Sequence, residues 1–328
     1  MLCFTNGDYA VDGIRHAGLS GEIVSWKDML HEGPVPSHLS LDELREVRAR
    51  FISERGWGGF DEVMEDFERR DAALAEFEDH KEVVLFFEHD LYDQLQLIQL
   101  LDWFARRESV PTRLTLVQAD EYLGNLSTDR LKALFEERHE VSSQELELGR
   151  AAWEAFRALE PIRISALLHQ DTSALPFLGD ALLRHLQEFP SVKNGLSRSE
   201  AQALEEIQAG RRPLREVYVA SHQEREDPVF LGDSVFAWYL ERLSDVCEPL
   251  VLFEGGGGLR APRTPDDEPG FWESRAEITD SGSAVLKGRK DHIERNGIDH
   301  WLGGVHLDGG EARWRWDETT GRIREGAV

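Results

Sequence analysis

Three ionisable residues follow one another directly after an apolar run, and their types suit them for chemistry. Glu88, His89 and Asp90 come after residues 83–87, and a strongly apolar segment begins at Leu91. A carboxylate can act as a general acid or base, and a histidine titrates near neutral pH and can also bind a metal. We therefore expect Glu88 to be a general acid or base and His89 to be a proton shuttle or a metal ligand.

Further polar residues in the first third of the chain could join this site. Each lies just after an apolar run or in the segment that follows one. The candidates for positioning a substrate are Asn6, Gly7, Trp26 and Gln94. The candidates for orienting groups or holding a metal are Asp8, Asp28 and Glu32, and the second candidate for proton transfer or metal binding is His31.

Crowded carboxylates carry an electrostatic cost that restricts the chemistry. Two carboxylates about 4 Å apart repel by about 4 kcal/mol at an effective dielectric constant of about 20. The repulsion is relieved if one acid has a raised pKa and keeps its proton, if a divalent cation binds, or if a cationic substrate group pairs with the acids. No HExxH or similarly spaced ligand motif occurs, so the expectation of a divalent metal rests on the convergence of these acids.

The elements that would bring these residues together are strands and helices in alternation. Four apolar runs, at residues 2–5, 22–26, 83–87 and 113–117, are typical of short buried strands, and helical segments separate them. This alternation predicts an α/β fold with a mostly parallel sheet and helices on both faces. The carboxyl ends of the strands meet at one edge, where open α/β sheets bind ligands.

We therefore predict an enzyme that performs hydrolysis or group transfer on a small polar or phosphorylated substrate, in an acidic crevice at that edge. Helix amino termini at the same edge favour an anion such as phosphate, provided that the nearby acids are neutralised. The alternative is a non-catalytic module that senses a small ligand, regulates, or contacts a protein partner or a second copy of itself.

Local structure offers a simpler interpretation for some of these residues. Asp90 and Asp93 have the spacing of a helix N-cap and a first-turn acid, which favours a structural role for Asp90. Asn6-Gly7-Asp8 could be a turn whose aspartate caps a helix, and His31-Glu32-Gly33-Pro34 could be a rigid turn with solvated side chains.

The register of one strand decides which ionisable side chain enters the crevice. Successive strand residues face opposite sides of a sheet, so we expect only one of Glu88 and His89 to face the site. A one-residue error in the phase of that strand would exchange the two.

Three motifs in the first third of the chain resemble a known bacterial family. They are Thr5-Asn6-Gly7-Asp8, Trp26-Lys27-Asp28 with His31-Glu32-Gly33-Pro34-Val35, and Glu88-His89-Asp90-Leu91-Tyr92-Asp93-Gln94-Leu95. Together they resemble the family called DUF1835, a domain of unknown function, within residues 2–104. The resemblance implies an α/β domain, and it implies no particular reaction, substrate or catalytic residue.

The rest of the chain predicts helical and winged-helix-like modules. A capped helix from Ser197, a strand at residues 216–219, a helix at 234–243 and a strand at 249–253 suggest a winged helix, and residues 196–253 resemble DUF3658, a region often found after DUF1835. The final block suggests a second winged-helix-like unit or a small α+β cap. The predicted domains are residues 1–138, 139–253 and 254–328.

Composition restricts the class of partner. The net charge of −26 disfavours nucleic acid and anionic membranes, and no apolar run has the roughly 18 residues needed to cross a bilayer. Trp301, Trp314 and Trp316 could stack on bases, but core or interface positions are the more common use of such residues. With only Cys3 and Cys247, a disulfide framework is excluded, and we expect a cytoplasmic protein.

Overall fold

The amino-terminal part of the chain folds around a five-stranded sheet. The structure is a computed structural model that describes residues 1–210, 213–264 and 266–326. In space the strands follow the order β2 (Glu22–Ser25), β1 (Leu2–Thr5), β4 (Glu82–Phe87), β5 (Arg113–Gln118) and β6 (His139–Glu140). The first four are parallel, and the short edge strand β6 is antiparallel to β5. The predicted α/β class with a mostly parallel sheet is confirmed.

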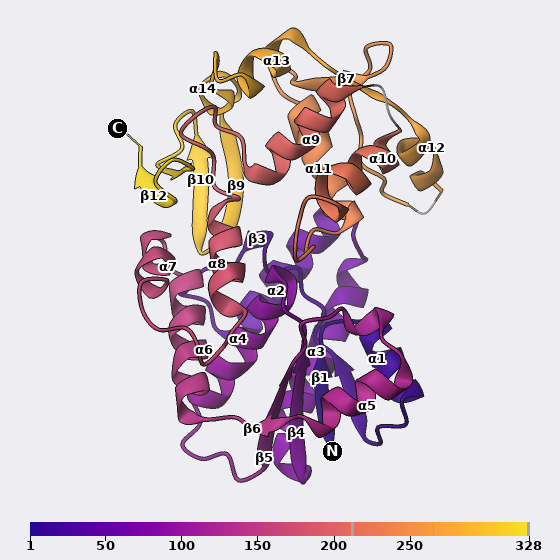
Figure 1. Ribbon diagram of the computed structural model, residues 1–328, viewed down its shortest axis with the longest axis vertical. Coiled ribbons are helices and arrows are strands. Elements are labelled where there is room, and N and C mark those ends of the chain that lie inside the picture. The colour runs from indigo at the N-terminus through magenta and orange to yellow at the C-terminus, as the bar shows by residue number, and fades with distance from the viewer. Residues whose placement is uncertain (211–212, 265, 327–328) are drawn as a thin grey trace.

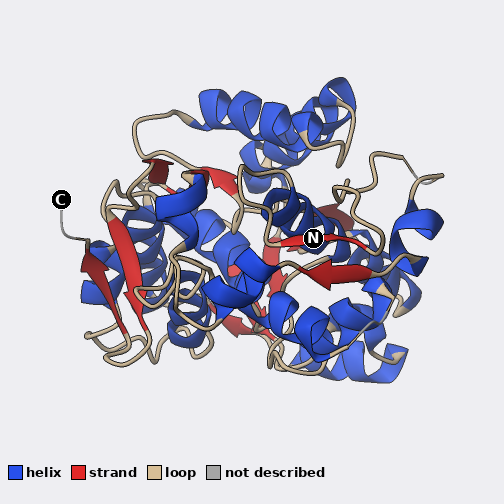
Figure 2. Ribbon diagram, turned by 90° about the horizontal axis from the view of Figure 1, so that it is seen from above, coloured by secondary structure: helices blue, strands red, loops and turns tan. Residues whose placement is uncertain are grey.

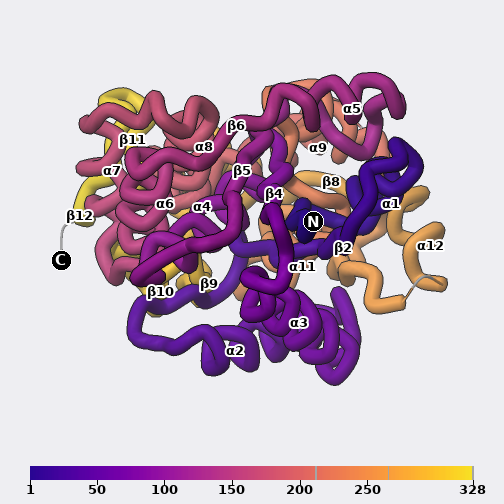
Figure 3. Tube along the Cα trace, turned by 90° about the horizontal axis from the view of Figure 1, so that it is seen from below, coloured from indigo at the N-terminus to yellow at the C-terminus, as the bar shows by residue number. Residues whose placement is uncertain are grey.

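Helices cover both faces of this sheet (Figure 1, Figure 2). One face packs against α1 (Asp8–His16) and α5 (Thr128–Glu136). The apolar cluster on the other face includes residues of α2 (Leu41–Glu54), α3 (Phe60–Ala75), α4 (Leu91–Ala105) and α6 (Ser143–Phe156). Figure 3 places α2 and α3 on the opposite side of the strands from α5.

Strand β4 supplies both apolar clusters because its side chains alternate. Val84 and Phe86 belong to the cluster beneath α1 and α5, whereas Val83, Leu85 and Phe87 belong to the larger one. All five are fully buried, which explains why the strand reads as a continuous apolar run.

Helix starts follow local sequence signals. Ser40 and Glu43 form a capping box at the start of α2, and Ser197 and Glu200 form another at the start of α9 (Arg198–Ala209). The side chain of Asp90 accepts a hydrogen bond from the backbone N–H of Asp93, so its predicted role as the N-cap of α4 is confirmed.

The middle of the chain contains the order of elements of a winged helix. Helices α9, α10 (Leu214–Tyr218) and α11 (Asp233–Ser244) are followed by the antiparallel strands β7 (Val251–Phe253) and β8 (Ala276–Ile278). An isolated bridge pairs Pro213 with Arg275, the residue that precedes β8. The wing between β7 and β8 carries the short helix α12 (Glu268–Glu273).

The strand predicted at residues 216–219 is wrong, because most of this segment forms α10. Helix α10 continues into a π-helical turn, η3 (Val219–Gln223). Leu214, Val217 and Ser221 are buried at helical spacing, so the apolar face required by packing overrides the strand preference of the valines.

Helix α11 is the third helix in this order, as the recognition helix is in DNA-binding winged helices, but it is largely buried. Tyr239 and Phe236 are covered almost completely, and Trp238 packs against Phe51 and Trp57 of the amino-terminal half. Recognition helices read bases with residues near their amino termini, and here that end exposes Asp233, whose charge would repel phosphate. This packing favours a structural role for the module.

The last block forms two hairpins after two short helices. The helices are α13 (Asp280–Leu286) and α14 (His292–Asn296), and the hairpins are β9 (Ile298–Gly303) with β10 (Val305–Gly309) and β11 (Trp314–Asp317) with β12 (Arg322–Glu325). Trp314 and Trp316 are buried, and Trp301 stacks on His306 at 4.4 Å between ring centroids. The block is therefore an α+β unit.

The β9–β10 hairpin pairs with a short strand of the amino-terminal half. The two-residue strand β3 (Gly33–Pro34) pairs in parallel with β9. Helices α7 (Ile162–Leu167) and α8 (Leu178–Leu186) lie between the halves in sequence, and one apolar cluster extends from Leu2 to Ile323. The loop after β2 is consequently fixed by residues from the far end of the chain. Within the described residues, no helix has the length and apolar character to span a membrane.

Candidate functional site

Three buried carboxylates converge at the carboxyl edge of the sheet, between β1 and β4. Glu88, Asp90 and Asp93 each place one oxygen so that the three atoms lie within 4.8 Å of one another. The chain leaves β1 toward β2 on one side, and β4 lies on the other side of β1, so this is the switch point of the sheet. We call these three residues the acidic cluster.

Hydrogen bonds from the strand ends fix the acidic cluster. Asp93 accepts from the Asn6 side-chain amide at 2.9 Å and from the Glu88 backbone N–H at 2.7 Å. Glu88 Oε1 accepts from the Leu123 N–H at 2.7 Å, and the Gln94 amide donates to the Glu88 carbonyl at 2.7 Å. The predicted residues Asn6, Glu88 and Gln94 therefore do come together.

The acidic cluster forms no ion pair within the described part of the chain. Among the described residues, no lysine, arginine or histidine forms an ion pair with any of its members. Burial together with the charge of Glu88 raises the pKa of Asp90 to about 7, and burial together with Asp90 and Glu88 raises the pKa of Asp93 well above its ordinary value. Burial also raises the pKa of Glu88. The cluster must retain protons or bind a cation.

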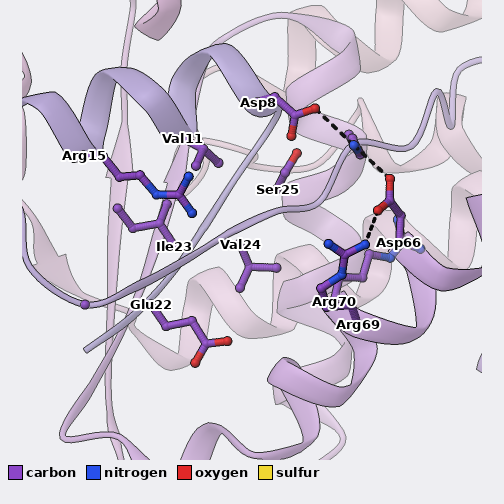
Figure 4. A pocket seen from close by; sticks show the side chains of 12 residues that line it. Asp8, Val11, Arg15, Glu22, Ile23, Val24, Ser25, Asp66, Arg69 and Arg70 are labelled. Atoms are coloured by element: carbon purple, nitrogen blue, oxygen red, sulfur yellow. Dashed lines mark hydrogen bonds and ion pairs between the residues drawn. The ribbon is translucent and has the colours of Figure 1, made fainter. Parts of the chain in front are cut away.

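Asp8 lies outside this cluster. Its side chain is exposed and forms an ion pair with Lys27 at 3.0 Å, and Lys27 also contacts Asp66 at 2.9 Å (Figure 4). These residues line an open cavity of about 430 Å³ between α1, β2 and α3. Lys27 therefore neutralises Asp8, which makes it a poor metal ligand in this arrangement.

Asp28 is neutralised by two buried arginines that the sequence-based prediction missed. Arg48 donates to its Oδ1 from Nε at 3.0 Å and from Nη2 at 2.8 Å, and Arg70 lies 3.9 Å from its other oxygen. A signal existed, because Arg48 lies between Leu44 and Phe51 on the apolar face of its helix. Asp28 was predicted as a possible metal ligand, and here the two arginine side chains supply the positive charge that balances it.

Glu32 belongs to a second polar group between the two halves of the molecule. It accepts a hydrogen bond from the Tyr239 hydroxyl, and its other oxygen lies 3.0 Å from Nε2 of His300. Tyr239 also contacts Glu188, which accepts from Ser199 Oγ at 2.7 Å. We call Glu32, Glu188, Tyr239 and His300 the interface cluster.

The side chains of the interface cluster are buried, and this burial, together with neighbouring charges, sets their pKa values. Burial raises the pKa of Glu32 to about 7, whereas the Arg184 guanidinium lowers the pKa of Glu188 to about 2 despite its burial. Burial and Arg242 lower the pKa of His300 well below its ordinary value. Tyr239 and His300 come from segments far from the predicted site, so no spacing in the sequence connected them with Glu32.

His31 is buried between aromatic rings. Its ring lies 6.0 Å from the Tyr92 ring and 5.4 Å from the Phe230 ring, measured between centroids, and the Tyr92 hydroxyl contacts the Asn6 carbonyl at 3.4 Å. Neither ring nitrogen of His31 has a hydrogen-bond partner in the described part of the chain. Burial lowers its pKa to about 4, so His31 is neutral at physiological pH.

The remaining predicted residues take different places. His89 is partly exposed, and its ring centroid lies 5.2 Å from that of Tyr122. Partial burial lowers the pKa of His89. Trp26 is only 1% exposed and donates to Gln99 at 2.8 Å, so a substrate cannot reach it. Gly7 is the N-cap of α1 in extended backbone, with open space around its α-carbon.

A segment of the winged-helix region covers the edge of the sheet. The Tyr122 hydroxyl accepts from and donates to the backbone of Val229, with an O···O distance of 3.0 Å, and Phe230 packs on His31. Burial lowers the pKa of His89, and the nearby charges of Asp120 and Asp227 oppose that shift. A ligand at the acidic cluster would therefore be enclosed partly by the carboxyl-terminal half.

Comparison with known proteins adds no assignment. No model of a protein family matches the chain, and no curated protein matches it. The resemblance to DUF1835 and DUF3658 stays a prediction.

Proposed function

We propose that the acidic cluster holds a divalent cation and that the protein performs hydrolysis or group transfer on a small polar or phosphorylated substrate at this edge of the sheet. One observation carries the proposal. Three buried carboxylates, Glu88, Asp90 and Asp93, offer oxygens within 4.8 Å of one another and have no cationic partner among the described residues. At this separation each pair of full charges would repel by about 3.5 kcal/mol at an effective dielectric constant of about 20.

The donor set supports a hard cation. All three ligand atoms are carboxylate oxygens, which suit Mg²⁺, Mn²⁺ or Ca²⁺ rather than a metal that prefers sulfur or imidazole. The neighbouring Gln94 is fully buried, and its Oε1 has no hydrogen-bond donor in the described residues. When bound, a cation of this class polarises a phosphoryl or carbonyl oxygen or lowers the pKa of a bound water.

The surrounding residues would position the reacting groups. The Asn6 amide and the Glu88 backbone N–H hold the Asp93 carboxylate in place, and the N-cap Asp90 ties the cluster to the start of α4. That helix end has a favourable dipole for a phosphate. His89 is the partly exposed ionisable group beside the cluster, so it is the residue we assign to proton exchange with a substrate.

Calorimetric titration tests the cation site. Wild type should bind Mg²⁺, Mn²⁺ or Ca²⁺, and Asp90→Asn should lose at least tenfold in affinity because one ligand charge is gone. Asp102→Asn is the matched control, since Asp102 is a buried acid of the same helix that pairs with Arg106 instead. The proposal fails if no cation binds, or if both variants bind like wild type.

Turnover tests the reaction. Wild type with the cation that binds should release product from at least one member of a panel of phosphate esters and small amides, and His89→Gln should be slower without losing the cation. Cation binding without any turnover would favour the alternative, a ligand-sensing or protein-interaction module. The burial of α11 and the cover that Val229 and Phe230 provide support that alternative.

A further inference from the structure

The buried side chain of Gln94 uses only one half of its amide group. Its Nε2 donates to the backbone carbonyl of Glu88 at 2.7 Å, which identifies that end of the amide as the nitrogen. The other end, Oε1, has no hydrogen-bond donor in the described part of the chain, although the side chain is fully buried. A buried acceptor in this state costs about 1–3 kcal/mol. A partner from outside the chain would remove this cost.

Gln94 is held against the strand end that carries the acidic cluster. It follows Asp93 directly in α4, and Asp90 is the N-cap of that helix. The carbonyl that its Nε2 contacts belongs to Glu88, the third acid of the cluster. The backbone N–H of Glu88 in turn donates to Asp93 at 2.7 Å. The unused amide oxygen therefore belongs to a side chain that the fold places beside all three acids.

The acidic cluster and Gln94 together form a nearly dry set of oxygen donors. Glu88 is 5% exposed, Asp90 is 4% exposed, and Asp93 and Gln94 are 0% exposed. A cation among these side chains would exchange most of its water shell for protein oxygens. Mg²⁺ dehydrates reluctantly and usually keeps several waters beside one or two carboxylates. Ca²⁺ instead takes roughly six to eight oxygen ligands, from carboxylates and amide carbonyls, in a flexible geometry.

The balance of charge favours a neutral side chain as the next ligand. The three carboxylates of the acidic cluster, when ionised, already exceed the two positive charges of one divalent cation. A further acid would add repulsion, whereas the amide oxygen of Gln94 adds a hard donor without a charge. Gln94 therefore suits a fourth ligand position better than another carboxylate would.

We propose that Oε1 of Gln94 is a fourth protein ligand of the cation at the acidic cluster, and that this cation is Ca²⁺ rather than Mg²⁺. The inference rests on the proposed function, because it uses the same cluster, and it adds a ligand residue and selects one cation. The ligands come from the end of β4 and the start of α4. Bound Ca²⁺ therefore ties these two elements together and should raise the thermal stability of the protein.

Gln96 provides a matched control on the same helix. It is also fully buried, and its Oε1 likewise has no hydrogen-bond donor in the described residues. Its Nε2 lies 3.5 Å from the backbone carbonyl of Asp28, an acid that Arg48 neutralises. Substitution of Gln96 therefore removes the same kind of buried amide from α4 without removing a group that contacts the acidic cluster.

Isothermal titration calorimetry on the full chain, after treatment with EDTA and its removal, tests the proposal with CaCl₂ and MgCl₂. We expect Ca²⁺ to bind wild type about tenfold more tightly than Mg²⁺, or better, which is a difference of about 1.4 kcal/mol. Gln94→Met, which has similar volume and no amide oxygen, should weaken Ca²⁺ binding by about tenfold. Gln94→Glu keeps an oxygen at this place and adds a charge, so it should bind Ca²⁺ at least as tightly as wild type. Gln96→Met should bind Ca²⁺ like wild type.

The outcomes separate this inference from the proposed function. If no divalent cation binds, both are wrong. If a cation binds but Ca²⁺ is not preferred to Mg²⁺, or if Gln94→Met binds Ca²⁺ like wild type, the cation site stands and the inference is overturned. A loss in Gln96→Met or in Gln94→Glu as large as that in Gln94→Met also overturns it, because the packing of α4 then explains the effect.

Thermal unfolding of each variant in EDTA, measured beside the titration, identifies a loss of binding that reflects only a loss of folding. The preference of wild type for Ca²⁺ requires no substitution, so it tests the proposal even if a variant does not fold.

Discussion

Asp90→Asn should stabilise the protein when divalent cations are absent. Asparagine is as good an N-cap as aspartate, so α4 keeps its start, while the substitution removes one of three crowded charges. Two ionised carboxylates whose oxygens lie within 4.8 Å of one another repel by about 3.5 kcal/mol or more at an effective dielectric constant of about 20. The raised pKa of Asp90 means that wild type lowers this repulsion in part by binding a proton. We therefore expect Asp90→Asn to increase the free energy of unfolding at pH 8 by about 1–3 kcal/mol, which is less than the full repulsion.

Urea unfolding in the presence of EDTA measures this gain. A carboxyl whose folded pKa, about 7, exceeds its unfolded value destabilises the folded state above that pH, and protonation removes the penalty as the pH falls. The difference between variant and wild type should therefore shrink between pH 8 and pH 5. Asp102→Asn should instead lower stability at both pH values, since it removes the buried one of the two acids that pair with Arg106. If Asp90→Asn is less stable than wild type at pH 8, the acidic cluster is not repulsive and the electrostatic argument is wrong.

Three further predictions concern the buried polar groups outside that cluster. Arg48→Met should lower the free energy of unfolding by about 3–5 kcal/mol in urea titrations, because it removes both hydrogen bonds to the buried Asp28 carboxylate and leaves only the longer ion pair with Arg70. Tyr239→Phe should cost about 1–3 kcal/mol by the same assay, because Glu32 loses a buried donor. Burial lowers the pKa of His185 to about 4, below its unfolded value of about 6.5. The contribution of this neutral histidine to stability is therefore present above pH 6.5 and is lost as the pH falls toward 4. His185→Phe should reduce the slope of the free energy of unfolding against pH in that window, and an unchanged slope would show that another group titrates.

Much of the fold could be predicted because its determinants are local. The apolar run ending at Phe87 is buried on both faces, and the polar residues that follow it have to lie at the sheet edge. The capping box of Ser40 and the cap of Asp90 depend on residues three positions away, so the spacing in the sequence is sufficient. The α10 segment was predicted incorrectly because its valines favour a strand and only packing showed the helical face.

The candidate site was predicted only in part. Glu88, Asn6 and Gln94 do meet, but Asp93 was expected to be no more than a first-turn acid. Its side chain turns toward the strand end because the Glu88 N–H and the Asn6 amide are both available there as donors.

The sequence by itself determined the four parallel strands of the sheet and the helices between them, and that the carboxyl ends of these strands present acids at one edge. Only the tertiary structure decided which acids meet. Asp28 is paired by Arg48 and Glu32 is bonded by Tyr239, which lies 207 residues away in the chain. A charge is neutralised by whatever lies within a few ångströms in space, and for these acids that neighbour comes from segments whose position no local pattern specifies. The acidic cluster is different, because no lysine or arginine among the described residues pairs with it.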